Sequence, residues 1–201
     1  MANAIQTALP DIEILLVEDK ANLPYGTKPP ERLYQLVLPL LKNMESKGCQ
    51  VIVIACNTVT TTIIDRLRQE ISIPLVGMEP MVKPAAQQTQ SGTIAVCATP
   101  ATLASKRYKW LKNKYAKNVK VLEPDCSNWA KLIEDRAIDR ANIEKQIESV
   151  CQAGADFIVL GCTHYHWIES IVQSVARDRA EILQSEQPAI DQLKKVLIQL
   201  S

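Results

Sequence analysis

VIVIACNT, at Val51–Thr58, and FIVLGCTH, at Phe157–His164, are two occurrences of one pattern in this chain. Each is an apolar run followed by a small residue, a cysteine, and short hydroxyl, amide or imidazole side chains. An apolar run of this length, bounded by small polar residues, predicts a buried strand of a parallel sheet. Each cysteine then lies at the carboxyl end of its strand, where open α/β sheets bind their ligands.

The two thiols, Cys56 and Cys162, are the first candidates for chemistry. The segment after each cysteine has a helical pattern, so each thiol is expected near the amino terminus of a helix. The partial positive charge there lowers the pKa of a thiol from about 8.5. Two such thiols, one in each half, predict two acid/base groups that face one substrate. The alternative is that either cysteine only packs in a core, since free cysteine is among the most buried residue types.

Composition narrows the class of protein. The 201 residues suffice for one large domain or two small ones, and 47% are hydrophobic. A net charge of +1 gives no reason to expect nucleic acid or a membrane surface as a partner. The amino terminus lacks a basic region followed by an apolar one. Six cysteines without a Cys-x-x-Cys pair indicate reduced thiols in a cytoplasmic protein.

Strand-like and helix-like segments alternate along the whole chain, which predicts an α/β fold with parallel sheets covered on both faces. The expected strands are 12–17, 51–55, 74–77, 94–98, 119–122, 157–160 and 181–183. The expected helices are about 29–47, 58–70, 81–90, 101–115, two within 127–153, one from about 168, and 189–200. A linker is expected at Ser91-Gly92, so that two α/β units join near residues 88–92.

A set of short motifs then occurs in a recognisable order: Asp19, Pro24-Tyr25-Gly26-Thr27, Ala55-Cys56-Asn57-Thr58, Ile73-Pro74-Leu75-Val76-Gly77 with Glu79-Pro80, Thr99-Pro100-Ala101-Thr102, and Leu160-Gly161-Cys162-Thr163-His164-Tyr165. With this set the chain resembles the glutamate racemases of the cofactor-independent aspartate/glutamate racemase superfamily. The motifs cover nearly the whole chain, and Pro-Tyr-Gly favours the glutamate branch over the aspartate branch.

The resemblance implies two flavodoxin-like parallel-sheet domains with a ligand cleft between them. The first domain would comprise residues 1–90 plus 182–201, and the second residues 91–181. It further implies racemisation of glutamate without a cofactor or a metal, supply of D-glutamate for peptidoglycan, and a homodimer.

The resemblance also implies roles for individual residues. Cys56 and Cys162 match the two catalytic bases. The side chains of Asp19, Glu134 and His164 match the other catalytic positions. Positions that hold or orient the amino acid are matched by Tyr25, Gly26, Asn57, Thr58, Thr99, Thr102, Thr163 and, again, His164.

One part of the family pattern is missing from the 201 residues. Family members open with a strand that ends in an Asp-Ser-Gly-x-Gly-Gly loop, whereas Met1–Ile5 resembles the helix after that loop. The first domain is therefore expected to be truncated at its amino terminus, without a strand in the middle of its sheet. Unpaired sheet edges recruit other chains, which adds a physical reason to expect a homodimer.

Three alternatives stay open at this point. One is a weakly active or inactive relative that binds an amino acid or a partner. Another is racemisation of aspartate or another amino acid, or a decarboxylation that needs one thiol. A metal site at Cys162, His164 and His166 is the least favoured, since zinc needs three or four ligands and the chain has no other histidine. His166 itself is expected at the surface or in a groove.

Overall fold

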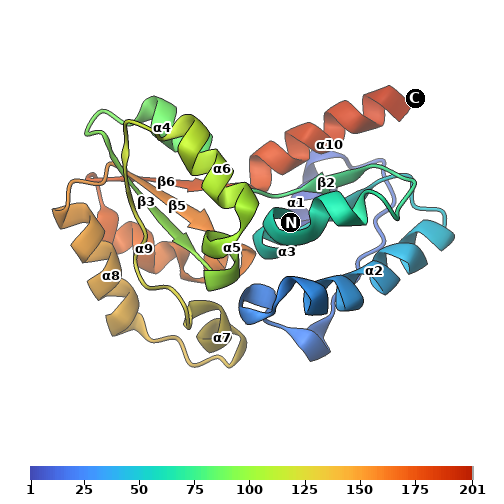
Figure 1. Cartoon of the computed structure of the whole chain (residues 1–201), viewed down its shortest axis with the longest axis horizontal. Coiled ribbons are helices and arrows are strands. Elements are labelled where there is room, and N and C mark those ends of the chain that lie inside the picture. The colour runs from blue at the N-terminus through green and yellow to red at the C-terminus, as the bar shows by residue number, and fades with distance from the viewer. Residues whose placement is uncertain (201) are drawn as a thin grey trace.

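Two parallel β sheets, each with helices packed on it, make up residues 1–200 of this computed structural model (Figure 1). The first sheet pairs β1 (Ile52–Ile54) with β2 (Leu75–Gly77). The second sheet has the order β4 (Lys120–Leu122), β3 (Thr93–Ala98), β5 (Phe157–Gly161) and β6 (Glu181–Gln184). The predicted α/β class with two parallel-sheet units is confirmed.

The helices follow the predicted alternation. They are α1 (Ala2–Ala8), α2 (Pro30–Ser46), α3 (Asn57–Leu67), α4 (Val82–Gln88), α5 (Pro100–Ala104), α6 (Lys106–Tyr115), α7 (Trp129–Glu134), α8 (Arg140–Gln152), α9 (Glu169–Ala176) and α10 (Glu186–Leu200). Three short 3-10 turns are η1 (Lys20–Asn22), η2 (Tyr25–Thr27) and η3 (Thr163–Ile168). Within residues 1–200, no helix combines the length and the apolar character that crossing a membrane requires.

The first sheet is covered on both faces because its side chains alternate. Ile54 packs in one cluster with Leu33 of α2 and Ile63 of α3. Val53 points the other way and packs beside Leu193 of α10 and Ile5 of α1. Helix α10 follows β6 of the second sheet, so the chain returns to the first sheet at its end (Figure 1).

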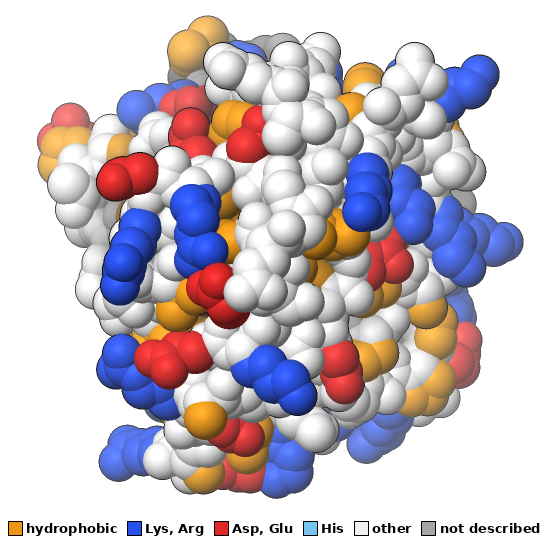
Figure 2. Space-filling model, turned by 90° about the vertical axis from the view of Figure 1, so that its left-hand side faces the viewer, with side chains coloured by type: hydrophobic (Ala, Val, Ile, Leu, Met, Phe, Trp, Pro, Cys, Tyr) orange, Lys and Arg blue, Asp and Glu red, His pale blue; other side chains and the backbone are white. Residues whose placement is uncertain are grey.

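The second sheet has the larger core. Its central strands β3 and β5 are buried along their whole length. One face of the sheet packs on α8 and α9, where Ile147 and Val172 are fully buried. The opposite face packs on α4 and α6. On the outer surface in Figure 2, Lys and Arg side chains are interspersed with Asp and Glu side chains.

The prediction of a strand at Ile12–Val17 is wrong. This segment is extended but pairs with no strand among the described residues, and Leu16 is 61% exposed. It lines one side of a cavity of about 1130 Å³, and β1 lines the same cavity. A strand needs a hydrogen-bonding neighbour, and apolar character alone does not provide one.

The single helix predicted at 101–115 is two helices. The chain is extended at Ser105, with ψ at 147°, and the Ser105 hydroxyl accepts from the backbone N–H of Tyr108. Serine favours such caps because its oxygen satisfies a free N–H at the start of a helix. The break directs α6 away from α5, which begins after Thr99.

The predicted linker at Ser91-Gly92 does connect α4 to β3. Helix α4 itself contacts β3 and β5, so the chain crosses from the first sheet to the second before α4, within residues 78–81. Asp156 anchors the linker, accepting hydrogen bonds from the Thr89 hydroxyl at 2.6 Å and from the N–H groups of Gln90 at 2.6 Å and Ser91 at 2.8 Å. The domain boundaries at 90/91 and 181/182 stay a prediction.

Candidate active site

Both cysteines lie where the repeated pattern predicts them. Cys56 is the extended residue directly before α3, and Cys162 is the extended residue directly before η3. The two segments face the same cavity, because Cys56 and the residues directly after Cys162, Thr163 and His164, all line it. This is the cavity described above, and Glu134 also contributes to its lining.

A chain of polar contacts leads away from Cys162. Its Sγ lies 3.7 Å from Nδ1 of His164, and Nε2 of the same ring lies 2.6 Å from Oε1 of Glu134. A carboxylate at Nε2 favours the tautomer with its proton on Nε2. Nδ1 is then free to accept the proton of the Cys162 thiol. The arrangement is a thiol, a base and an orienting acid in series.

Burial sets the protonation of both thiols. It raises the pKa of Cys162 to about 12, although hydrogen bonds from the backbone at His164 and Tyr165 act in the opposite direction. Burial likewise raises the pKa of Cys56, against hydrogen bonds from the backbone of Val59 and Thr58 and from the Thr58 hydroxyl. The expectation of lowered thiol pKa values is therefore wrong, because removal from water outweighs the helix-end N–H groups. The charge of Cys56 also raises the pKa of Cys162, as expected for two thiols that face one space.

Asn57 carries an unusual buried amide. The residue is 2% exposed, and neither its side-chain nitrogen nor its side-chain oxygen has a hydrogen-bond partner within residues 1–200. An unpaired buried polar group costs about 1–3 kcal/mol. Such a group directly after Cys56 is suited to binding a polar group of a ligand.

Three threonine hydroxyls join the two halves. Oγ1 of Thr58, in α3, lies 2.9 Å from Oγ1 of Thr99 and 3.2 Å from Oγ1 of Thr102. Thr99 and Thr102 are themselves 3.0 Å apart, and all three residues are buried. Gly26 packs against them so closely that a Cβ there would lie 2.6 Å from Cγ2 of Thr99. Thr99 and Thr102 thus lie at the junction but do not line the large cavity.

Asp19 and Tyr25 form a separate pair. The Tyr25 hydroxyl donates to Oδ2 of Asp19 at 2.6 Å, and the Asn22 amide donates to Oδ1 at 2.8 Å. Both residues line the cavity. Tyr25 is buried in the cluster against which Cys56 packs. The donors to the Cys56 thiol are different groups, those of Thr58 and Val59.

The cavity also brings in residues that the motifs do not single out as binding residues. Thr163 and Trp167 both line the cavity, but only Thr163 is among the predicted site residues. The Trp167 side chain is 67% exposed. His166 lies in the cavity lining, as expected for a groove residue, with Nδ1 2.6 Å from the Thr163 carbonyl oxygen. The only signal for Trp167 in the sequence is its type, one of three tryptophans in the chain.

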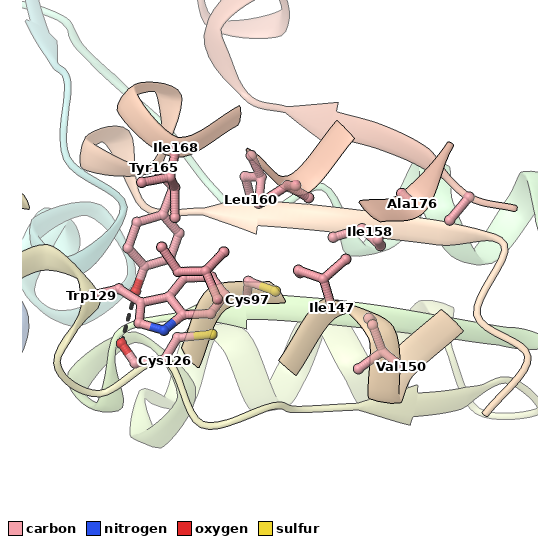
Figure 3. Close-up of a cluster of buried hydrophobic side chains, with 14 of the residues drawn as sticks. Cys97, Cys126, Trp129, Ile147, Val150, Ile158, Leu160, Tyr165, Ile168 and Ala176 are labelled. Atoms are coloured by element: carbon pink, nitrogen blue, oxygen red, sulfur yellow. Dashed lines mark hydrogen bonds between the residues drawn. The ribbon is translucent and has the colours of Figure 1, made fainter. Parts of the chain in front are cut away.

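A buried aromatic pair supports helix α7, which carries Glu134 at its end. Trp129, at the start of α7, packs edge-on against Tyr165 with ring centroids 5.4 Å apart. The Tyr165 hydroxyl donates to the Cys126 carbonyl at 3.1 Å (Figure 3). Cys97 and Cys126 are buried in the same cluster, in the packing role expected from the sequence. Helix α7 is thereby held close to η3, where its Glu134 reaches His164.

No group of three or more His, Cys, Asp or Glu side chains in residues 1–200 has an arrangement that could hold a metal ion.

Comparisons with known proteins agree on the family. The Asp/Glu/Hydantoin racemase family model matches residues 1–193. A glutamate racemase of Herpetosiphon aurantiacus is 35% identical over 197 residues, covering 96% of this chain and 78% of that protein. One from a Roseiflexus species is 35% identical over 200 residues, covering 97% of this chain and 73% of that protein.

Solved structures of the family share the fold. Glutamate racemase RacE1 from Bacillus anthracis superposes with a TM-score of 0.85 at 25% identity, covering 100% of this chain and 77% of that one. Glutamate racemase from Aquifex pyrophilus gives a TM-score of 0.77 at 28% identity, covering 96% and 77%. A sequence match across nearly the whole chain, together with this fold, shows that the chain belongs to the Asp/Glu/Hydantoin racemase family of isomerases.

Proposed function

We propose that this protein interconverts L- and D-glutamate without a cofactor, with Cys56 and Cys162 as the two bases. The substrate follows from its relatives, which are named glutamate racemases. The observation that carries the mechanism is the series Cys162, His164 and Glu134 at a junction that Cys56 reaches from the other half.

The reaction needs a proton to leave one face of Cα and another to arrive at the opposite face. In one direction, His164 takes the proton of Cys162, and the resulting imidazolium is stabilised by the Glu134 carboxylate. The Cys162 thiolate then removes the α-proton, and the Cys56 thiol delivers a proton to the other face. The reverse reaction exchanges the two roles.

The charged groups of the substrate need hydrogen-bond partners close to the two thiols. The Asn57 amide, without a partner within residues 1–200, supplies both a donor and an acceptor. The Thr163 hydroxyl, in the cavity lining, supplies a further donor. The buried hydroxyls of Thr58, Thr99 and Thr102 bond one another, so they would donate to the substrate only by exchanging those bonds, and Tyr25 and Gly26 pack beside them. Such preorganised donors stabilise the negative charge that develops when Cα loses its proton.

Exchange of the α-hydrogen with solvent deuterium tests this function directly. We expect exchange from both enantiomers of glutamate, and loss of racemisation in Cys56→Ala and in Cys162→Ala. Cys49→Ala is the matched control, because Cys49 lines the same cavity at the opposite end of β1. Absence of exchange from either enantiomer at millimolar glutamate would contradict the proposal.

Two other functions remain distinguishable by the same assay. Exchange with aspartate but not glutamate would identify an aspartate racemase. Binding of either amino acid without exchange would identify a protein that binds its ligand and does not turn it over.

The proposal extends to the setting of the enzyme. We infer that it acts in the cytoplasm as a homodimer and supplies D-glutamate for peptidoglycan. Support for the dimer comes from apolar side chains that remain exposed at the rim of the large cavity, namely Leu15, Leu16 and Trp167.

A further inference from the structure

We propose that Asp19 serves the reaction as a positioning residue that acts through Tyr25, and not as a carrier of protons. Its carboxylate would hold the Tyr25 phenol, and thereby keep the Tyr25–Gly26 turn against both halves of the site. This inference rests on the proposed racemisation, although one of its tests below is independent of turnover.

The carboxylate of Asp19 is already engaged on both oxygens. One accepts from the Tyr25 hydroxyl at 2.6 Å and the other from the Asn22 amide at 2.8 Å. Both donors belong to its own segment, six and three residues further along the chain. The groups that donate to the Cys56 thiol are those of Thr58 and Val59. Asp19 is therefore bonded to the wall of the site and not to the thiol.

Tyr25 connects Asp19 to the residues around Cys56. Its ring is buried in the cluster that also packs against Cys56. Burial, and then the hydrogen bond to Asp19, raise the pKa of the phenol well above its ordinary value. The phenol thus keeps its proton and remains a donor throughout the neutral range. The hydrogen bond of 2.6 Å to an anionic acceptor is of the short, charge-assisted type.

The turn that Tyr25 begins lies between the two halves. Turn η2 contacts α3, which follows Cys56, and also α5, which follows Thr99. At Gly26 no side chain fits, since a Cβ would lie 2.7 Å from the Cβ of Thr99. A small displacement of Tyr25 would therefore shift the backbone of Gly26 relative to both helices. Misplacement of about 1 Å in a catalytic site can cost about 10²-fold in rate.

Three substitutions separate positioning from proton transfer. Asp19→Asn keeps an oxygen that accepts from Tyr25 but removes the charge. Asp19→Ala removes both, and Tyr25→Phe removes only the phenolic donor. If Asp19 positions Tyr25, Asp19→Ala and Tyr25→Phe each lose about tenfold or more in kcat/KM with a raised KM, and Asp19→Asn, which keeps a neutral acceptor for the phenol, loses less than either. The double variant Asp19→Ala/Tyr25→Phe loses no more than either single variant, because both remove one interaction.

The pH profile supplies a second readout. Under positioning, Asp19→Asn leaves both limbs of the kcat profile in place. Under proton transfer, Asp19→Asn is as inactive as Asp19→Ala, one limb of the profile moves, and Tyr25→Phe stays near wild type. That second set of results would overturn the inference. Asp11→Asn is the control, an exposed acid that lines the same cavity.

A reactivity measurement keeps the test valid even if the protein does not racemise glutamate. The rate of Cys56 alkylation by iodoacetamide, mapped by mass spectrometry, reports the surroundings of this thiol without turnover. Positioning predicts a wild-type rate in Asp19→Asn, and a common altered rate in Asp19→Ala and Tyr25→Phe. A rate that falls equally in Asp19→Asn and Asp19→Ala, with Tyr25→Phe unchanged, would instead make Asp19 the base of Cys56.

Discussion

At the scale of single residues, the two thiols differ in their surroundings. Cys162 has a histidine within 3.7 Å and an acid behind that histidine. Cys56 has hydrogen-bond donors from Thr58 and Val59. We therefore expect Cys162 to depend on His164 for loss of its proton. The reactivity of Cys56 should not depend on His164.

This asymmetry predicts an unequal effect of His164→Asn on the two enantiomers. The variant should slow removal of the α-proton from the enantiomer that Cys162 deprotonates by about 10²–10⁴-fold. The isotope effect of Cα-deuterated substrate should then rise for that enantiomer only. His166→Asn is the matched control, because His166 bonds the backbone nearby and does not contact Cys162 in the hydrogen bonds of residues 1–200. Equal slowing of both enantiomers would contradict the assignment.

At the scale of elements, hydrogen bonds from single side chains determine how neighbouring helices and strands are connected. Ser105 ends one helix and starts the next, so that α5 keeps Thr99 and Thr102 at the junction. Asp156, just before β5, binds the linker that leads into β3. Burial of Asp156 opposes ionisation, but the donors of Thr89, Ser91 and Gln90 outweigh it and lower its pKa.

The lowered pKa of Asp156 predicts that the stability of the fold depends on pH. A carboxyl group with a lowered folded-state pKa stabilises the fold above its unfolded pKa of about 3.9, and this contribution is lost as the pH falls through the folded value. Asp156→Asn should thus lower the free energy of unfolding by about 1–3 kcal/mol at pH 7. The difference from wild type should stay constant above about pH 5 and narrow below about pH 4.

Urea unfolding of both proteins at several pH values measures this difference. Asp178→Asn is the control, an exposed carboxyl group in the turn before β6. A difference that does not narrow on acidification would show that the Asp156 side chain acts by packing and not by its charge.

At the scale of the whole molecule, the two cysteine strands differ in their neighbours. Strand β5 pairs with β3 on one side and β6 on the other, whereas β1 pairs with β2 alone among the described residues. Leu15 and Leu16, on the segment across the cavity from β1, are 38% and 61% exposed. Open sheet edges and exposed apolar residues favour association with another chain.

The expected result in solution is a homodimer that buries this region. Light scattering at low micromolar concentration should give twice the mass of the 22.4 kDa chain. Leu16→Glu should shift the mass toward 22.4 kDa, since a charge in an apolar interface is costly. Ile138→Glu is the control, at an exposed apolar residue between α7 and α8. A clean monomer at this concentration for the wild type would exclude the dimer.

Much of the fold and of the site can be predicted from the amino-acid sequence, because the signals are local. The run Val51–Ala55 predicts its strand by apolar character alone, and the polar residues after Cys56 and Cys162 mark the carboxyl ends of two strands. The motif Leu160-Gly161-Cys162-Thr163-His164-Tyr165 likewise predicts a role for His164, whereas no motif of the ordered set contains Glu134. Patterns of this kind depend only on residues that are neighbours in sequence, so they can be recognised in a single sequence without a structure.

Other features required the tertiary structure, because they depend on groups distant in sequence. The raised thiol pKa values result from burial by many residues, and no local pattern records that burial. The contact of Thr58 with Thr99 and Thr102 exists only because α3 and α5 meet. Ile12–Val17 has the composition of a strand, but strand formation requires a partner within hydrogen-bonding distance, and only the arrangement of the whole chain decides whether one is there.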